Sequence, residues 1–484
     1  MTTKRCQEGR NAAVASRHAV RQVPPRRPLR KRERCVGAGN DGMRGKLRRG
    51  FPGVLTGVAL RYDPDQRGCR LRVPMDLSRR SVVLGLSASA LAGCASGQAP
   101  VAAVADTLPT APNPGWDAWV EGFRGRAVGS GISASVFDRA FSVAGFVPGV
   151  VERDRNQTER VRTLEDYLAI VADDARIGEG RSRFAQYGGL LEQLESRFGV
   201  EAKVLTSIWG VESRYGTRRG SIPVISATST LAFDGRRGAF FERQLLAALR
   251  IQQNGDIGPR DMTGSWAGAM GHTQFIPTTY EAYAIDFRGD GRRDIWADDP
   301  TDALASAANY LAESGWRRGQ PWGVEVQLPE GFDYGLTGRG NGRNPDSWAS
   351  LGVRDMNGRA VPNHGTGSII LPMGASGPAF MIFANYTVLS RYNNSQNYII
   401  AVGYLADRIA GGPPIRAGFP PDAQGLRLEE RQEIQRRLAQ AGYDPGDADG
   451  VIGDRTIAAI RAWQTANGQP VTGLATRDLL ESLR

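Results

Sequence analysis

Ser207-Ile-Trp-Gly-Val-Glu-Ser-Arg-Tyr-Gly216 is the stretch that decides the fold and the chemistry of this 484-residue chain. Apolar residues recur in and before it at helical spacing, and the helix is expected to end between Gly216 and Gly220. Glu212 would then lie near the end of an apolar helix. Apolar surroundings disfavour an ionised carboxyl and raise its pKa toward the range of a general acid. The alternative is an ordinary surface carboxylate on an amphipathic helix.

Three further motifs follow Glu212 along the chain. They are Gly268-Ala-Met-Gly-His-Thr-Gln-Phe-Ile-Pro277, Asn309-Tyr-Leu311 and Arg391-Tyr-Asn-Asn-Ser-Gln-Asn-Tyr398. In order and approximate spacing, the four motifs resemble the membrane-bound lytic murein transglycosylase B family over residues 115–412. The resemblance implies a mainly α-helical, lysozyme-like catalytic domain that acts on the glycan strands of peptidoglycan.

The same resemblance implies a mechanism with Glu212 as the sole catalytic carboxylate. Glu212 would first protonate the oxygen between N-acetylmuramic acid and N-acetylglucosamine. It would then take the proton from the muramoyl C6 hydroxyl, which closes a 1,6-anhydro ring without consuming water. The family match also places a set of side chains along the glycan groove, although each tyrosine in it can equally be a core residue: Tyr167, Arg236, Arg237, Ser265, Gln274, Tyr310, Tyr392, Asn393 and Tyr398.

Two other functions stay open at this point. Glycosidases with two acids need a partner carboxylate. If Asp234, Asp256 or Asp261 faced Glu212, the protein would be a hydrolytic muramidase. A non-catalytic scaffold that binds the cell wall is the second alternative, but a scaffold has no need for a buried acid. A cysteine nucleophile is excluded because all four cysteines precede residue 95, and His272 receives no role.

One acidic loop suggests a metal. Asp286-Phe-Arg-Gly-Asp290-Gly-Arg-Arg-Asp294 resembles the EF-hand-like loop of the family, with Asp at template positions one, five and nine and Gly at six. Position three is Arg288 and position twelve is Ala297, so the closing ligand is missing. We expect a metal-free polar loop and no required cofactor. The alternative is a structural calcium ion bound by Asp286, Asp290 and Asp302.

The start of the chain carries most of the basic excess. Residues 1–74 hold 19 Lys and Arg against 5 Asp and Glu, which predicts a disordered tract upstream of a true start at Met75. Residues 75–93 have the order of a lipoprotein signal peptide: Arg79-Arg80, an apolar run, and Leu91-Ala-Gly-Cys94. From Cys94 onward there are 40 basic and 44 acidic residues, so the composition gives no support for nucleic-acid binding.

These features predict an outer-membrane lipoprotein that faces the periplasm and is anchored through lipid on Cys94. The twin-arginine and general secretory routes both fit the signal. Residues 94–113 read as a tether, 114–412 as the catalytic domain and 413–424 as a linker.

Residues 425–484 resemble a three-helix peptidoglycan-binding domain, which would raise the local concentration of the enzyme at the wall. Strand-like alternation is confined to 322–328 and 367–371, and the Gly- and Asn-rich segment 331–367 has no assignment. The expected partners are glycan strands and the outer membrane, and association with a cell-wall synthesis complex is left open.

Overall fold

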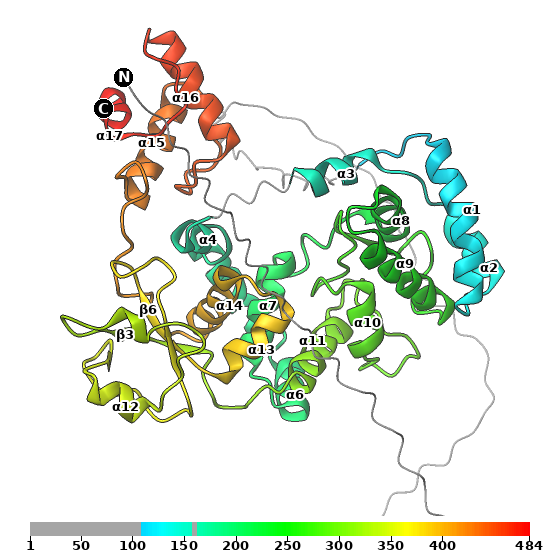
Figure 1. Cartoon of the computed structure of the whole chain (residues 1–484), viewed down its shortest axis with the longest axis horizontal. Helices are drawn as coiled ribbons and strands as arrows, with labels where there is room; N and C mark the ends of the chain where they lie inside the picture. Colours follow the sequence, from blue (N-terminus) through cyan, green and yellow to red (C-terminus); the bar gives the residue numbers. More distant parts are fainter. Residues whose placement is uncertain (1–107, 157–161) are drawn as a thin grey trace, which may run out of the picture. The chain divides into compact units, whose positions relative to one another are not determined.

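The computed structural model describes residues 108–156 and 162–484, so the predicted leader and Cys94 lie outside it. The described part is mainly α-helical, as predicted (Figure 1). Its elements are α1 (Pro114–Gly129), α2 (Ala134–Phe141), α3 (Pro148–Arg155), α4 (Leu164–Val171), α5 (Asp174–Gln186), α6 (Gly188–Phe198), α7 (Ala202–Ser213), β1 (Ile222–Pro223), α8 (Val224–Asp234), α9 (Gly238–Gln253), β2 (Thr263–Gly264), α10 (Pro277–Tyr283), α11 (Thr301–Glu313), β3 (Gly323–Gln327), the 3-10 helix η1 (Tyr334–Leu336), α12 (Pro345–Ser350), β4 (Arg354–Asp355), β5 (Ser368–Ile370), β6 (Ala379–Ile382), α13 (Ala384–Tyr392), α14 (Gln396–Ile409), α15 (Leu428–Gln440), α16 (Asp454–Ala466) and α17 (Arg477–Leu483).

Helix α7 lies in the largest apolar core of the described residues. Its residues from Val204 to Gly210 are all buried, because α5, α6, α11 and α14 pack around it. Figure 1 shows α7 beside α14. The two helices run antiparallel, and the Ser207 hydroxyl donates a 2.6 Å hydrogen bond to the carbonyl of Val402. The end of α7 therefore lies beside the start of α14.

Helix α7 ends at Ser213, before the glycines at which the sequence placed its end. Arg214 (φ 47°) and Tyr215 (φ 52°) adopt the left-handed conformation, which is uncommon outside glycine and typical of functional sites. The turn brings the Tyr215 ring over Gly210, where a Cβ atom would lie 2.6 Å from Tyr215 Cζ. The chain thus leaves the helix abruptly, one residue after Glu212.

A four-stranded antiparallel sheet interrupts the helices in the order β4-β3-β6-β5. Strands β3 and β5 fall in the two segments with strand-like alternation, but β6 gave no such signal because all four of its residues are buried. Segment 331–367, unassigned from sequence, contains η1, α12 and β4. It packs through the buried Trp348, whose indole N–H donates to the carbonyl of Gly367 at 2.9 Å.

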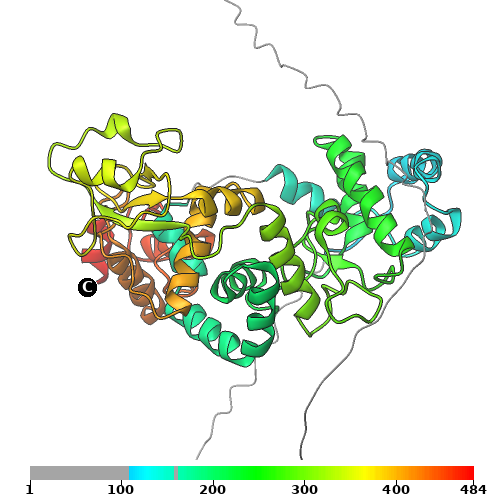
Figure 2. The same cartoon turned by 90° about the horizontal axis from the view of Figure 1, so that it is seen from below.

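Helices α8, α9 and α3 form a second helical layer. Both views show α8 and α9 side by side (Figures 1 and 2). A small apolar cluster that includes Leu231 and Phe241 holds this layer together. Helices α15, α16 and α17 have an apolar core of their own, in which Ile434, Ile460 and Trp463 are buried. The predicted three-helix C-terminal unit is confirmed.

Candidate active site

Glu212 occupies the last turn of α7, with its side chain half-buried. The Tyr398 hydroxyl, from the first turn of α14, donates a 2.5 Å hydrogen bond to Glu212 Oε1. Burial raises the pKa of Glu212 from 4.5 to about 7, and the hydrogen bond from Tyr398 opposes part of that rise. Near neutral pH this carboxyl is protonated in part of the molecules and ionised in the rest, so it is able to act either as an acid or as a base.

Three tyrosines predicted for the groove surround this carboxyl. Burial and then the charge of Glu212 raise the pKa of Tyr167 to about 12, and the same two causes raise the pKa values of Tyr392 and Tyr398. Tyr392 donates to the carbonyl of Thr273 at 2.6 Å. Its ring meets that of Tyr310 edge-on, with 5.2 Å between centroids. Helices α4, α11, α13 and α14 therefore each bring one tyrosine to this cluster.

The loop before α10 supplies the polar side of the site. Gln274 is left-handed (φ 51°), and its amide group donates to the carbonyls of Gly271 at 2.8 Å and Arg219 at 3.1 Å. The Ser265 hydroxyl accepts the N–H of Ala269 at 3.1 Å and so closes the Gly-Ala turn. Asn393 ends α13, and its Oδ1 accepts the N–H of Ser395 at 2.9 Å. Each of these three polar side chains therefore forms its hydrogen bonds with backbone groups around the site.

The two arginines predicted for the glycan groove each bind a carboxylate of the protein itself. Arg236 and Arg237 lie between α8 and α9, and each forms a 2.5 Å ion pair with the buried Asp154 at the end of α3. This pairing lowers the pKa of Asp154. Contact of either arginine with substrate stays a prediction.

His272, which received no role from the sequence, lies at the centre of the loop and is 2% exposed. Its Nδ1 accepts the indole N–H of Trp209 at 3.0 Å, so Nε2 carries the proton and donates to the carbonyl of Ala297 at 2.6 Å. Its own carbonyl accepts the Ser213 hydroxyl at 2.6 Å. His272 therefore joins both sides of the Glu212 turn to the acidic loop. The one available signal was its place inside the second motif.

A second catalytic carboxylate was left open between three aspartates. Asp234 and Asp256 each form a 2.5 Å ion pair with an arginine, and Asp261 is exposed. In the described part of the chain, burial and Tyr398 account for the shifted pKa of Glu212, and no other carboxylate contributes to it. Asp234 and Asp256 are thus each bound to an arginine, and the mechanism with a single acid stays a prediction.

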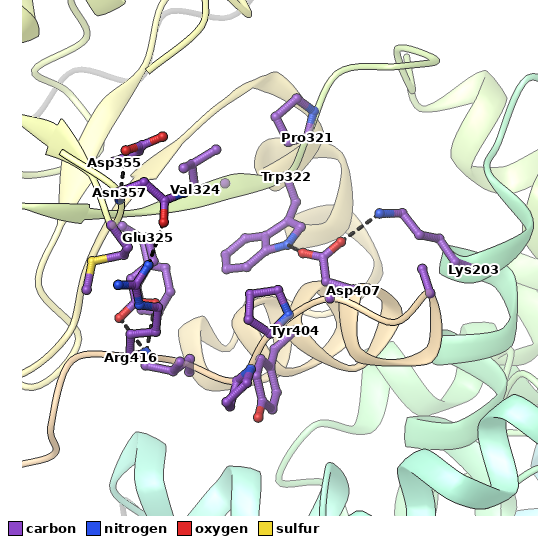
Figure 3. Close-up of a pocket in the computed structure, with 18 residues that line it drawn as sticks. Lys203, Pro321, Trp322, Val324, Glu325, Asp355, Asn357, Tyr404, Asp407 and Arg416 are labelled. Atoms are coloured by element: carbon purple, nitrogen blue, oxygen red, sulfur yellow. Dashed lines mark hydrogen bonds and ion pairs between the residues drawn. The ribbon is translucent and has the colours of Figure 1, made fainter. Parts of the chain in front are cut away.

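A cavity of about 850 Å³ lies at the opposite end of α7, between the helical core and the sheet (Figure 3). Asp407 accepts hydrogen bonds there from Lys203 at 2.6 Å and from the indole of Trp322 at 3.1 Å. Lys203 is nine residues from Glu212, or about 13 Å along the helix axis. The cavity is thus a separate feature whose polar groups bind one another.

Residues 115–407 match the family model described as the transglycosylase SLT domain. The chain belongs to this family. Residues 427–483 match a second model, the putative peptidoglycan binding domain. The predicted family and the predicted mainly α, lysozyme-like fold are confirmed, and the chain carries a transglycosylase domain followed by a peptidoglycan-binding domain.

Relatives of this SLT-family chain include a curated protein of Escherichia coli K12, membrane-bound lytic murein transglycosylase B. The two are 32% identical over 234 residues, which is 46% of this chain and 61% of that relative. SltB3 of Pseudomonas aeruginosa, solved with NAG-anhNAM-pentapeptide, is 46% identical with a TM-score of 0.63, over 77% of this chain and 100% of SltB3. Slt35 of E. coli, solved with calcium, is 27% identical with a TM-score of 0.53, over 62% of this chain and 94% of Slt35.

The E. coli relative is described as membrane-bound, which agrees with a place in the cell envelope. Within residues 108–156 and 162–484, no helix has the length and apolar character needed to cross a bilayer. Lipidation of Cys94 stays a prediction.

Proposed function

We propose that this protein is a lytic transglycosylase that cleaves the β-1,4 bond between N-acetylmuramic acid and N-acetylglucosamine and releases 1,6-anhydromuropeptides. The observation that carries the proposal is the Glu212 carboxyl, held by Tyr398 at 2.5 Å with a pKa of about 7. Membership of the transglycosylase SLT family supplies the substrate class.

One carboxyl performs both proton transfers in this reaction. Protonated Glu212 gives its proton to the glycosidic oxygen as the bond from C1 to that oxygen breaks. The muramoyl C6 hydroxyl then attacks C1, and its proton passes to the Glu212 carboxylate. The enzyme regains its starting state, and neither water nor a cofactor is consumed. A pKa near 7 suits both steps because neither protonation state is strongly preferred.

The tyrosine cluster has a matching role. Tyr398 keeps the carboxyl in one orientation, while Tyr167 and Tyr392 limit the water around it. Restricted water favours capture of C1 by the C6 hydroxyl over hydrolysis. SltB3, which was solved in complex with NAG-anhNAM-pentapeptide, supports this proposal.

The C-terminal domain is proposed to bind the wall and so to raise the concentration of glycan at the catalytic domain. Anchoring in the outer membrane through Cys94 would keep both domains in the periplasm. A partner complex for wall synthesis remains a prediction.

Mass spectrometry of peptidoglycan digested by the wild-type protein and by Glu212→Gln tests the proposal. Muropeptides lighter by one water than hydrolytic products, and absent with the variant, are expected. Products with reducing ends would overturn the proposal in favour of a hydrolase with a second acid. Products released equally by the variant would exclude Glu212, and no release by either protein would indicate a binding scaffold.

A further inference from the structure

In the acidic loop between α10 and α11, the carboxylate oxygens accept hydrogen bonds from backbone N–H groups of the same loop. Asp286 accepts the N–H groups of Gly289 at 2.6 Å, Asp290 at 3.2 Å and Gly291 at 2.8 Å. Three of the roughly four lone-pair sites of the Asp286 carboxylate are therefore used by backbone N–H groups of the loop itself.

Asp302, in the first turn of α11, is fully buried and does the same. Its Oδ1 accepts the N–H groups of Phe287 at 3.0 Å and Arg288 at 3.2 Å, and its Oδ2 accepts that of Asp294 at 3.0 Å. Asp302 is the residue that could have supplied the missing calcium ligand. Its carboxylate instead accepts hydrogen bonds from the backbone of the acidic loop and holds the two ends of the loop together.

The guanidinium of Arg288 lies among the carboxylates. Its nitrogens are 3.4 Å from Asp302, 3.6 Å from Asp299, 3.8 Å from Asp290 and 3.9 Å from Asp294. Four negative charges thus converge on one positive charge, which is attached to the chain at template position three.

This donor set does not fit calcium. Calcium takes six to eight oxygens at about 2.3–2.6 Å, usually with a bidentate carboxylate at position twelve. Position twelve is Ala297, and the carboxylates face backbone N–H groups and Arg288. Among the described residues, no three His, Cys, Asp or Glu are grouped so as to hold a metal.

We propose that Arg288 takes the place of the calcium ion in this loop, as a cation fixed by the chain itself. In not binding calcium, this chain would differ from Slt35, which was solved in complex with calcium. An arginine is never lost to chelators and stays protonated across the working pH range. The fold of this protein is therefore independent of calcium.

The loop is connected to the active site. Asp294, which faces Arg288, accepts the N–H groups of Trp296 and Ala297, both at 2.9 Å. The carbonyl of Ala297 in turn accepts a hydrogen bond from His272 Nε2, and the carbonyl of His272 accepts one from the hydroxyl of Ser213, the residue after Glu212. The charge on Arg288 thus supports the backbone that orients Glu212.

Thermal unfolding of the purified protein, measured in millimolar calcium chloride and in EDTA, tests the inference. The wild-type Tm is expected to be the same in both solutions, and a calorimetric titration with calcium is expected to show no binding. Arg288→Ala should lower the Tm in EDTA by about 4 °C or more, because four carboxylates lose their cation.

Arg292→Ala is the matched control, since it removes the same charge from an exposed position of the same loop. It should keep the wild-type Tm. Arg288→Lys retains a positive charge among the four carboxylates and should keep most of the Tm, which provides a test if Arg288→Ala does not fold.

Two results would overturn the inference: a wild-type Tm that rises with calcium, or an Arg288→Ala variant as stable as Arg292→Ala.

Discussion

Replacement of Glu212 by Gln should stabilise the protein in a pH-dependent way. The folded protein raises the pKa of Glu212 from 4.5 to about 7. Below about pH 4.5 the carboxyl is protonated in both the folded and the unfolded chain, and it has no effect. As the pH rises from there to 7, the unfolded chain loses the proton before the folded one does, so the free energy of unfolding falls.

The difference between the two pKa values corresponds to at most about 3 kcal/mol at 1.36 kcal/mol per pKa unit. Because Glu212 is only half-buried, we expect about 1–3 kcal/mol. Gln has the same size, and its carbonyl still accepts the Tyr398 hydroxyl. Glu212→Gln should therefore exceed the wild type in stability by this amount above pH 7, and by nearly nothing at pH 4.5.

Urea unfolding of both proteins at about pH 4.5 and about pH 8 measures the two differences. Glu121→Gln, at an exposed position of α1, is the control and should unfold like the wild type at both pH values. A stability gain that is equal at the two pH values, or a variant less stable than the wild type at pH 8, would refute the raised pKa.

Three other variants examine the surroundings of Glu212. Tyr398→Phe removes the bond that lowers the pKa of Glu212, so the alkaline limb of kcat/KM should move up by about 1 pH unit; an unmoved limb would contradict the bond. His272→Ala leaves buried partners of the imidazole unpaired and should cost about 2–4 kcal/mol in urea unfolding; a loss under 1 kcal/mol would contradict its connecting role. Gly210→Ala should lower the free energy of unfolding by about 1–3 kcal/mol and lower kcat, because the new Cβ would meet the Tyr215 ring. Gly178→Ala on α5 adds its Cβ in open space and should stabilise the protein. Equal effects of the two substitutions would contradict the packing of Tyr215 on Gly210.

Sequence patterns were sufficient for the parts of this molecule that depend on local periodicity. The apolar helix around Glu212 and strands β3 and β5 follow from spacing, and the final three helices follow from the resemblance to a peptidoglycan-binding domain. Strand β6 does not, because a strand buried on both faces lacks alternation.

Contacts between side chains that are far apart in the sequence could not be predicted from local patterns. The side chains of Arg236 and Arg237 meet Asp154, more than 80 residues earlier, and no local pattern announces that contact. Arg288 was identified as unfavourable for calcium, but the convergence of four carboxylates on it needs the folded loop. The contacts of His272 likewise join segments that are far apart in the sequence.

The hydrogen bond between Glu212 and Tyr398 spans 186 residues, and that between Ser207 and Val402 spans 195. Contacts of such high sequence separation carry a large loop-closure cost and slow folding. A chain that lacks α14 has no Tyr398 hydroxyl for Glu212 and leaves one side of α7 uncovered, so the environment of this carboxyl depends on segments at both ends of the domain. We therefore expect a chain cut before α14 to lose activity together with its fold.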